Sequence, residues 1–287
     1  MSYLLGIILS FVAMFSFGSY VLFFKKGVNK IGAYSAIAYL RLLGLIIIVI
    51  FSLFFVKFRP LPAWAWLNLL IAAVSSALAL FFFSKAAKAG KLSIISPISS
   101  AFAIPTVIFS FIFLHELIAP VKYFLVLTVV VGIILLSTDF QQLKRLKIKT
   151  SSKGIGFALL ACCLFGVWAT ASKPLAQYLT GFSALSYIEI VTCIFILLPV
   201  LFKPKILKKP DKKSAINLIL ATIIWIVSAI SIYPAFQYLP ASIVTPITSS
   251  SPLVTIFLAW IFLKEKLKIN HLLGAVLIIG SLIFLSI

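Results

Sequence analysis

Ten long apolar runs constrain the fold of this chain more than any other feature of its sequence. A helix that spans a bilayer needs ~20 predominantly apolar residues, and each run is close to that length. Of the 287 residues, 63% are hydrophobic and only 10% are charged, which is outside the composition of soluble domains. We therefore predict an all-α polytopic membrane protein with ten transmembrane helices. The predicted spans are 3–24, 34–56, 64–84, 93–114, 121–138, 154–172, 182–202, 214–233, 242–263 and 271–287.

The chain repeats itself at a nearly constant offset. Residues 17–20 (FGSY) correspond to 165–168 (FGVW) at an offset of 148, and residues 93–100 (SIISPISS) correspond to 242–249 (SIVTPITS) at an offset of 149. Each repeat holds five predicted helices. Because five is odd, the second repeat enters the membrane from the opposite side, so the two repeats are inverted.

This duplication predicts three parts of the chain. The predicted parts are a first five-helix repeat over 1–138, a basic linker over 139–153 and a second five-helix repeat over 154–287. Inverted repeats are typical of secondary transporters, in which the solute site lies near the membrane midplane where the repeats meet. An inert duplicated bundle is the alternative interpretation.

The basic residues are concentrated in alternate connections between the predicted helices. The formal net charge is +20, and 20 of the 25 Lys and Arg residues fall in the connections 25–33, 85–92, 139–153, 203–213 and 264–270. The intervening connections hold four, including Lys173. Since basic loops stay on the cytoplasmic side, these five connections are predicted to face the cytoplasm, with both termini outside. The predicted location is the cytoplasmic (inner or plasma) membrane, and no nucleic acid is expected as a partner because the basic residues form no soluble face.

Other functional classes lack the residues that they require. Two histidines and five scattered acidic residues do not form the clusters of a membrane enzyme, so we expect no enzymatic activity. Cys162, Cys163 and Cys193 lie in apolar runs without metal-ligand spacing, so no metal and no cofactor are expected. A phosphate-binding loop of the G-x-x-x-x-G-K-[ST] type is missing from the sequence, and ATP is therefore not expected to drive this chain directly.

Arg41 and Glu189 are the first candidate site residues. They occupy equivalent positions of the two repeats, and each lies about 12 Å into a predicted helix at ~1.5 Å rise per residue. Ionisable groups within the hydrocarbon are expensive and usually face a cavity or a partner. Because the repeats are inverted, we expect the two side chains at similar depth, where they pair or compete for a charged group of a solute. A purely structural ion pair stays open as the alternative.

Helix breakers form a second candidate constellation. Prolines interrupt the fourth and ninth predicted helices at corresponding places, and hydroxyls beside them can satisfy the backbone carbonyls that a proline frees. The predicted cavity residues are Ser96, Pro97, Ser99 and Pro105 in the first repeat and Thr245, Pro246, Thr248 and Pro252 in the second. Kinked helices that merely pack are the alternative.

Aromatic and acidic side chains complete the candidates. Aromatic residues near the predicted helices could line a pocket, although such residues also serve as interfacial anchors. The aromatic candidates are Tyr20, Tyr39, Trp168, Tyr187 and Tyr233. Glu116 and Glu265 follow the fourth and ninth helices, where we expect them to cap or pair, with proton coupling as the alternative.

Several short motifs, in their order and spacing, resemble the drug/metabolite transporter superfamily, and specifically its EamA-like transporter family. The motifs are Phe17-Gly18-Ser19, Tyr39-Leu40-Arg41, Ser251-Pro252-Leu253-Val254, Phe262-Leu263-Lys264-Glu265-Lys266-Leu267 and Leu272-Leu273-Gly274-Ala275. The resemblance covers both halves. It implies ten helices in two inverted repeats, a central cavity and transport of small metabolites, often as efflux.

Two features depart from the family pattern. Ten-helix members are expected to keep both termini in the cytoplasm, whereas the charge distribution predicts the reverse orientation, which we adopt. The proline of the first repeat is Pro105, whereas the offset from Pro252 leads to Ala103.

These observations together predict a secondary transporter that moves a small amino acid-like, sugar-like or drug-like metabolite by alternating access, with efflux as the expected direction. The expected partners are this solute and the lipid bilayer, and protons are a candidate coupling ion through Glu189. A non-transporting membrane scaffold, an uptake carrier of the same fold and a channel are the alternatives. The solute, the coupling ion and the oligomeric state are left open.

Overall fold

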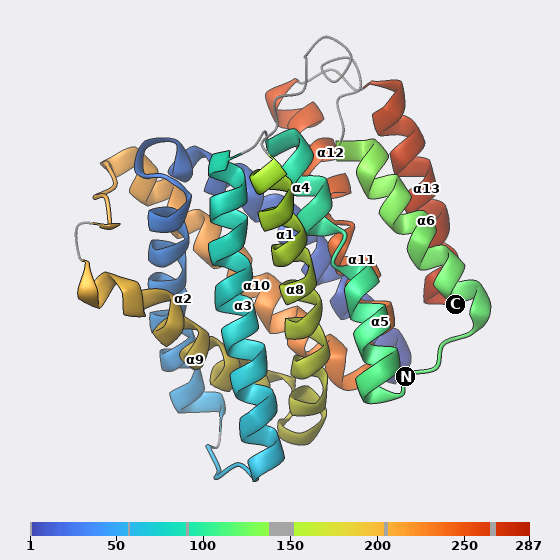
Figure 1. Cartoon of the computed structure of the whole chain (residues 1–287), viewed down its shortest axis with the longest axis horizontal. Coiled ribbons are helices and arrows are strands. Elements are labelled where there is room, and N and C mark those ends of the chain that lie inside the picture. The colour runs from blue at the N-terminus through green and yellow to red at the C-terminus, as the bar shows by residue number, and fades with distance from the viewer. Residues whose placement is uncertain (1, 57, 90–91, 138–151, 204–205, 265–267) are drawn as a thin grey trace.

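A computed structural model describes residues 2–56, 58–89, 92–137, 152–203, 206–264 and 268–287 (Figure 1). Every regular element in this part of the chain is a helix. The helices are α1 (Ser2–Ile31), α2 (Ala33–Phe55), α3 (Ala63–Ala89), α4 (Leu92–Ser100), α5 (Ala103–Leu114), α6 (Pro120–Ser137), α8 (Ser152–Leu179), α9 (Gly181–Phe202), α10 (Lys212–Tyr238), α11 (Ala241–Ser249), α12 (Ser251–Leu263) and α13 (Ile269–Ser286). The predicted linker 139–153 lies almost entirely outside the described residues, as does Glu265.

Ten segments of these helices are long and apolar enough to cross a membrane. Each predicted run overlaps one of them, and the predicted fold class is confirmed. Four helices, α1, α3, α8 and α10, continue five or more residues past the predicted C-terminal edges, because a charged residue or a proline follows each apolar run. A charge marks where a chain approaches the headgroups, whereas the helix itself continues as long as its backbone hydrogen bonds are made.

The clearest correction concerns Lys173. Its position after an apolar run predicts a connection, but it lies inside α8 and is only 7% exposed. Its aliphatic stem continues the apolar face of the helix, and its ammonium group finds acceptors on a neighbouring helix. A buried lysine of this kind cannot be distinguished from a loop lysine by counting charges.

The fourth and ninth predicted spans are each broken into two helices. The first break falls at residues 101–102, between α4 and α5, and the second falls at Ser250, between α11 and α12. Pro252 lies in the first turn of α12, and Pro105 is the third residue of α5. The first backbone N–H groups of a helix have no intrahelical acceptor, so a proline fits at either place without loss. The two-residue displacement of Pro105 therefore leaves the breaks at equivalent positions.

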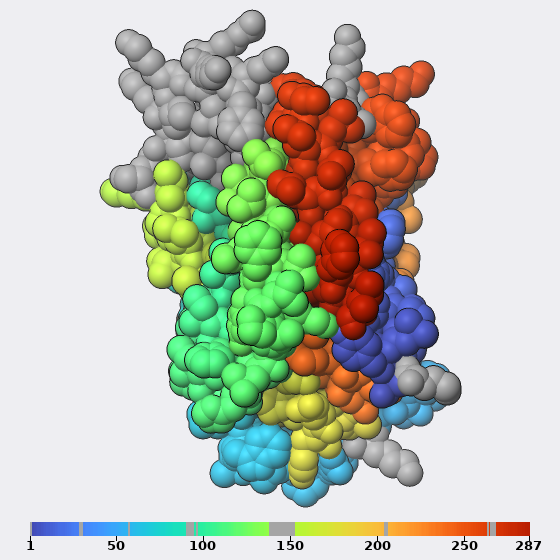
Figure 2. Space-filling view, turned by 90° about the vertical axis from the view of Figure 1, so that its right-hand side faces the viewer, coloured from blue at the N-terminus to red at the C-terminus, as the bar shows by residue number. Residues whose placement is uncertain are grey.

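The two repeats exchange their packing partners. The first helix of each repeat lies along the third helix of the other, so that α1 packs against α10 and α8 packs against α3. The second helices, α2 and α9, contact each other, as do the last helices, α6 and α13. Figure 2 shows α6 and α13 side by side on one face of the molecule. Two inverted repeats give this pattern when an approximate twofold axis passes between α2 and α9 and between α6 and α13.

Alternate connections lie at opposite ends of the bundle. In Figure 1 the C-terminal ends of α1, α3, α6 and α12 lie at the upper end, and those of α2, α5, α8 and α10 lie at the lower end. The upper end, toward which the lysine-rich connections lead, is called the basic end below, and the lower one the opposite end. Lys122 at the start of α6 lies near both chain termini, because its Nζ donates to Tyr3 Oη at 3.3 Å and to the Leu285 carbonyl at 3.4 Å. Both termini are therefore at the opposite end.

Glycines allow the close approach of the broken helices. A Cβ on Gly18 of α1 would lie 2.5 Å from Val254 Cβ of α12, and one on its repeat equivalent Gly166 of α8 would lie 2.8 Å from Pro105 Cβ of α5. Real Cβ atoms do not approach so closely, so each position needs the bare backbone. Small residues at helix contacts allow such approach within lipid.

Candidate functional site

An ion pair lies at the centre of the bundle, where the two repeats meet. A guanidinium nitrogen (Nη1) of Arg41 on α2 donates to Oε2 of Glu189 on α9. Both residues are buried, at 8% and 3% exposure. They are separated by 148 residues, which is the repeat offset. The approximate twofold axis thus brings equivalent positions face to face, and opposite charges at those positions attract where identical residues would repel.

The depth of the pair follows from the helix bounds. Arg41 is the ninth residue of α2 and Glu189 the ninth of α9, so each lies about 12 Å along its helix. The two helices start from opposite ends of the bundle. In a hydrocarbon core of ~30 Å, both side chains are therefore close to the midplane. A neutral pair is far less costly there than either charge alone.

Aromatic and polar groups enclose the pair. The Tyr233 hydroxyl donates to Glu189 Oε1 at 3.1 Å, and Trp168 Nε1 donates to Tyr233 Oη at 3.2 Å. The Arg41 guanidinium carbon lies 4.3 Å from the ring centroid of Trp225 on α10. This arrangement orients both charged groups and gives the cation a second, aromatic partner. We call Arg41, Glu189, Tyr233, Trp168 and Trp225 the central cluster.

The other three aromatic candidates lie in different parts of the bundle. Tyr20 on α1 is close enough to Arg41 to interact with its charge, and its ring lies edge-on to Phe17 and tilted to Phe24, with centroids 6.2 Å and 5.9 Å away. Tyr39 packs against the cluster that includes Leu218, toward the basic end. Tyr187 donates its hydroxyl hydrogen to the Arg59 carbonyl at 2.7 Å, on the connection between α2 and α3 at the opposite end. Of the five aromatic candidates, the structure joins Trp168 and Tyr233 to the ion pair by hydrogen bonds and brings Tyr20 within electrostatic range of Arg41.

The hydroxyl groups beside the helix breaks differ in their hydrogen bonds. Thr245 and Thr248 donate to carbonyls of their own helix, those of Ala241 at 2.8 Å and Val244 at 3.0 Å. Pro97 and Pro246 lie inside α4 and α11. The Ser99 hydroxyl is buried and, within the described part of the chain, has no hydrogen-bond partner. The side chain of Ser96 is outside the described residues.

Thr192 is a site residue that the sequence analysis missed. It lies one turn beyond Glu189 on α9, fully buried, and its Oγ1 has no partner among the described residues. Residues three apart lie on the same side of a helix, so this hydroxyl is on the Glu189 side of α9. A buried polar atom without a partner costs ~1–3 kcal/mol, which marks it as a group available to a ligand. Nothing in the sequence distinguishes Thr192 from the other hydroxyl residues of these helices.

Two polar contacts lie at the opposite end of the bundle. Glu116, at the end of α5, accepts hydrogen bonds from the N–H groups of Ala241 at 3.0 Å and Ser242 at 3.1 Å, and from the Ser242 hydroxyl. Its carboxylate therefore caps the N-terminus of α11, where a negative charge is favoured. Capping was one of the roles expected for this residue.

Lys173 makes the second of these contacts. Its Nζ donates to the carbonyls of Phe236 at 3.0 Å and Leu239 at 2.8 Å, at the C-terminal end of α10. A cation there stabilises carbonyls that have no intrahelical donor. Its repeat equivalent Lys25, toward the basic end, is exposed. The two ends of the bundle thus differ although their sequences correspond. Glu116, Lys173 and the residues that they bind are called the end clamp below.

The described residues hold no group of three or more His, Cys, Asp or Glu side chains that could bind a metal ion. The central cluster contains one acid and one base, together with hydrogen-bonding aromatic groups. Such a set can bind a small polar solute by hydrogen bonds and charge.

Comparison with known proteins places this architecture in a family. The model of the EamA-like transporter family matches residues 4–138 and 152–287. The chain belongs to the EamA-like transporter family. It is accordingly a multi-pass membrane protein of the transporter class, as the motifs predicted.

Individual relatives agree with this assignment. An uncharacterised protein of Methanocaldococcus jannaschii is 32% identical over 135 residues, which are 45% of this chain and 93% of that protein. An uncharacterised transporter of Helicobacter pylori is 25% identical over 133 residues, 46% of this chain and 45% of that one, so the match spans less than half of the Helicobacter protein. Less than half of this chain thus matches almost all of the archaeal protein. The archaeal protein is therefore about as long as one repeat of this chain.

A crystal structure of another protein superposes with a TM-score of 0.79 at 14% identity, covering 96% of both chains. At this identity the similarity establishes the fold alone.

Proposed function

We propose that this transporter moves a small metabolite by alternating access, with the central cluster as its solute site. The observation that carries the proposal is the buried Arg41–Glu189 pair, which joins equivalent positions of the two inverted repeats near the midplane. Inverted-repeat transporters bind their solutes at such an interface. Charged side chains within the membrane are also energetically costly, and those that are retained usually have a function.

The chemistry of the cluster favours an amino acid-like solute over a sugar-like or drug-like one. A solute that enters between Arg41 and Glu189 has to replace the partner of each. A carboxylate can bind the guanidinium and an ammonium group can bind the Glu189 carboxylate, so a zwitterion leaves the site neutral. The Trp225 ring adds an apolar wall, and the unpartnered Thr192 hydroxyl adds a hydrogen bond.

The end clamp suggests how access alternates. Glu116 of the first repeat holds α11 of the second across the repeat interface at the opposite end, whereas Lys173 ties α8 to α10 within the second repeat. This end must therefore open by releasing the Glu116 contact. If the basic connections face the cytoplasm, as their charge predicts, the clamped end faces outward. Export then consists of solute entry from the basic end, followed by release of the Glu116 contact.

Two further features belong to this proposal. The repeats, 1–138 and 154–287, act as the two moving halves, joined through 139–153. Glu189 is the candidate for proton coupling, since it is the acid that a solute would separate from Arg41.

Metabolite profiling tests this function. Cells that express the wild-type chain, Glu189→Gln or the control Lys122→Gln, which lies outside the central cluster, are compared at matched membrane levels for intracellular and extracellular metabolites. We expect an amino acid-like solute outside cells with the wild type and the control, and its loss with Glu189→Gln. Depletion from the medium would reverse the direction to uptake. Equal profiles in all three cultures would contradict transport through the central cluster and favour a scaffold.

A further inference from the structure

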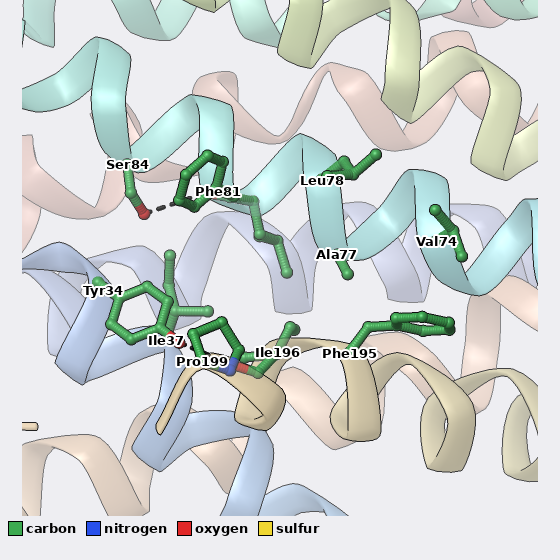
Figure 3. A pocket seen from close by; sticks show the side chains of 11 residues that line it. Tyr34, Ile37, Val74, Ala77, Leu78, Phe81, Ser84, Phe195, Ile196 and Pro199 are labelled. Atoms are coloured by element: carbon green, nitrogen blue, oxygen red, sulfur yellow. Dashed lines mark hydrogen bonds between the residues drawn. The ribbon is translucent and has the colours of Figure 1, made fainter. Parts of the chain in front are cut away.

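An apolar hollow of about 240 Å³ lies between α2 and α3 of the first repeat and α9 of the second (Figure 3). Its walls are formed mainly by aliphatic and aromatic side chains, among them Ile37, Ala77 and Phe195. Its two hydroxyl groups are already used within the chain. Tyr34 donates to the Ile196 carbonyl at 2.8 Å, and Ser84 donates to the Leu80 carbonyl at 2.9 Å. Both side-chain hydroxyls are therefore occupied, and the hollow suits an apolar occupant.

The hollow opens to the side of the bundle. Two of its lining residues on α3, Leu78 and Phe81, are 41% and 38% exposed. Both lie within a helix that spans the membrane, so these exposed surfaces meet lipid rather than water. Acyl chains surround the mouth, and water has no polar partners inside.

The length of the hollow matches one leaflet. Along α3 the lining runs from Val74 to Ser84, a distance of about 15 Å at ~1.5 Å rise per residue. That is half of a hydrocarbon core of ~30 Å. Since α3 ends at Ala89, the lined stretch lies in the half of the membrane next to the basic end. An acyl chain from the leaflet at this end can fill the hollow along its length.

Lysines follow the lining residues at the C-terminal ends of two of the helices that form the hollow. Lys85 and Lys88 follow Ser84 on α3, Lys203 follows Pro199 by one turn at the end of α9, and all three are exposed. The Lys85 ammonium lies 4.5 Å from the ring centroid of Phe81, which lines the hollow, and 5.6 Å from that of Phe157 on α8. The acid on the nearby connection, Asp211, accepts a hydrogen bond from the Ser214 N–H at 3.3 Å and so caps α10. Three lysine charges stand against the single charge of Asp211, so the rim is cationic at the level where lipid phosphates lie.

We infer that this hollow is a binding site for one anionic phospholipid. One acyl chain lies between α3 and α9, and the phosphate lies among Lys85, Lys88 and Lys203. Apolar burial supplies affinity for any phospholipid, and the three lysines supply the preference for an anionic headgroup. Because the site is formed by both repeats, the bound lipid bridges them next to the basic end. The site is separate from the central cluster and does not depend on the solute.

Native mass spectrometry of the purified full-length protein tests the site, with dioleoylphosphatidylglycerol and dioleoylphosphatidylcholine as probes. The wild type should bind one phosphatidylglycerol molecule more tightly than phosphatidylcholine. Ala77→Phe, which fills the hollow, should weaken binding of both lipids at this site. Ala63→Phe places the same substitution at an exposed position of α3 near the opposite end and is the matched control.

A second variant does not disturb the packed interior. Replacing Lys85, Lys88 and Lys203 by Gln changes only exposed side chains and should reduce the preference for phosphatidylglycerol roughly tenfold or more. Lys122→Gln, toward the opposite end, should leave that preference unchanged. Equal lipid binding by the wild type and the triple variant, or an equal loss with Ala63→Phe and Ala77→Phe, would overturn the assignment.

Discussion

Neutralising one charge of the central pair should destabilise the protein more than removing both charges. In Glu189→Gln the Arg41 charge stays buried near the midplane without a counter-ion, and the Tyr233 hydroxyl loses its anionic acceptor. Breaking a buried pair on one side costs about 3–5 kcal/mol, because the remaining charge is uncompensated. The double variant Arg41→Met/Glu189→Leu leaves no charge and retains similar volume, so its stability should equal or exceed that of the wild type by up to about 4 kcal/mol.

The assay compares thermal stability with transport. The purified proteins are heated in one detergent, and the temperature at which half remains monodisperse is measured for each. We expect the order Glu189→Gln below wild type, with the double variant at or above wild type. In transport, by contrast, both variants should be inactive. A stable Glu189→Gln variant would refute the electrostatic argument, and a double variant that still transports would refute the solute site.

Three further predictions follow from particular contacts. Gly166→Ala should destabilise the protein by about 1–3 kcal/mol, since its Cβ meets the facing helix. Gly156→Ala, whose Cβ meets open space on the same helix, should instead stabilise it by about 0.5–1 kcal/mol in the same melting assay, because alanine is the better helix former. Glu116→Gln weakens a charged cap by about 1 kcal/mol, so amide hydrogen exchange at the start of α11 should rise roughly fivefold without a change in exchange at α13; unchanged exchange at α11 would contradict the end clamp. Thr192→Val should leave stability unchanged or raised, because it removes an unpartnered hydroxyl, and should raise the KM of the solute; a loss of stability would show that the hydroxyl is already satisfied.

The sequence predicts the apolar runs, the repeat and the inverted topology. Each of them depends on the order of residue types along the chain and not on tertiary contacts. Twenty-residue apolar stretches can satisfy their backbone only as helices in lipid. Arg41 and Glu189 stand out for a related reason, since a charge is conspicuous against hydrocarbon. Their common offset and the odd number of helices together predict a shared depth, and in the structure their side chains are in contact.

The remaining site depends on tertiary contacts that local patterns do not encode. Trp225 contacts Arg41 because α10 of the second repeat packs against α2 of the first. Lys173 resembles a loop lysine in sequence, yet carbonyls at the end of another helix allow its burial. Thr192 differs from other threonines only in lacking a partner, which depends on the whole surrounding fold. These contacts depend on which helices pack together, and the exchange of packing partners between the two repeats determines the packing.

Solute counterflow in proteoliposomes tests the central claim most directly. Vesicles that contain the purified wild-type protein are loaded with the unlabelled solute found by profiling, and uptake of the labelled solute is followed. Alternating access around the central cluster predicts transient accumulation of label against its gradient with the wild type, and none with Arg41→Met/Glu189→Leu. A labelled solute that only equilibrates with the wild type, or accumulates equally with the double variant, would contradict the account.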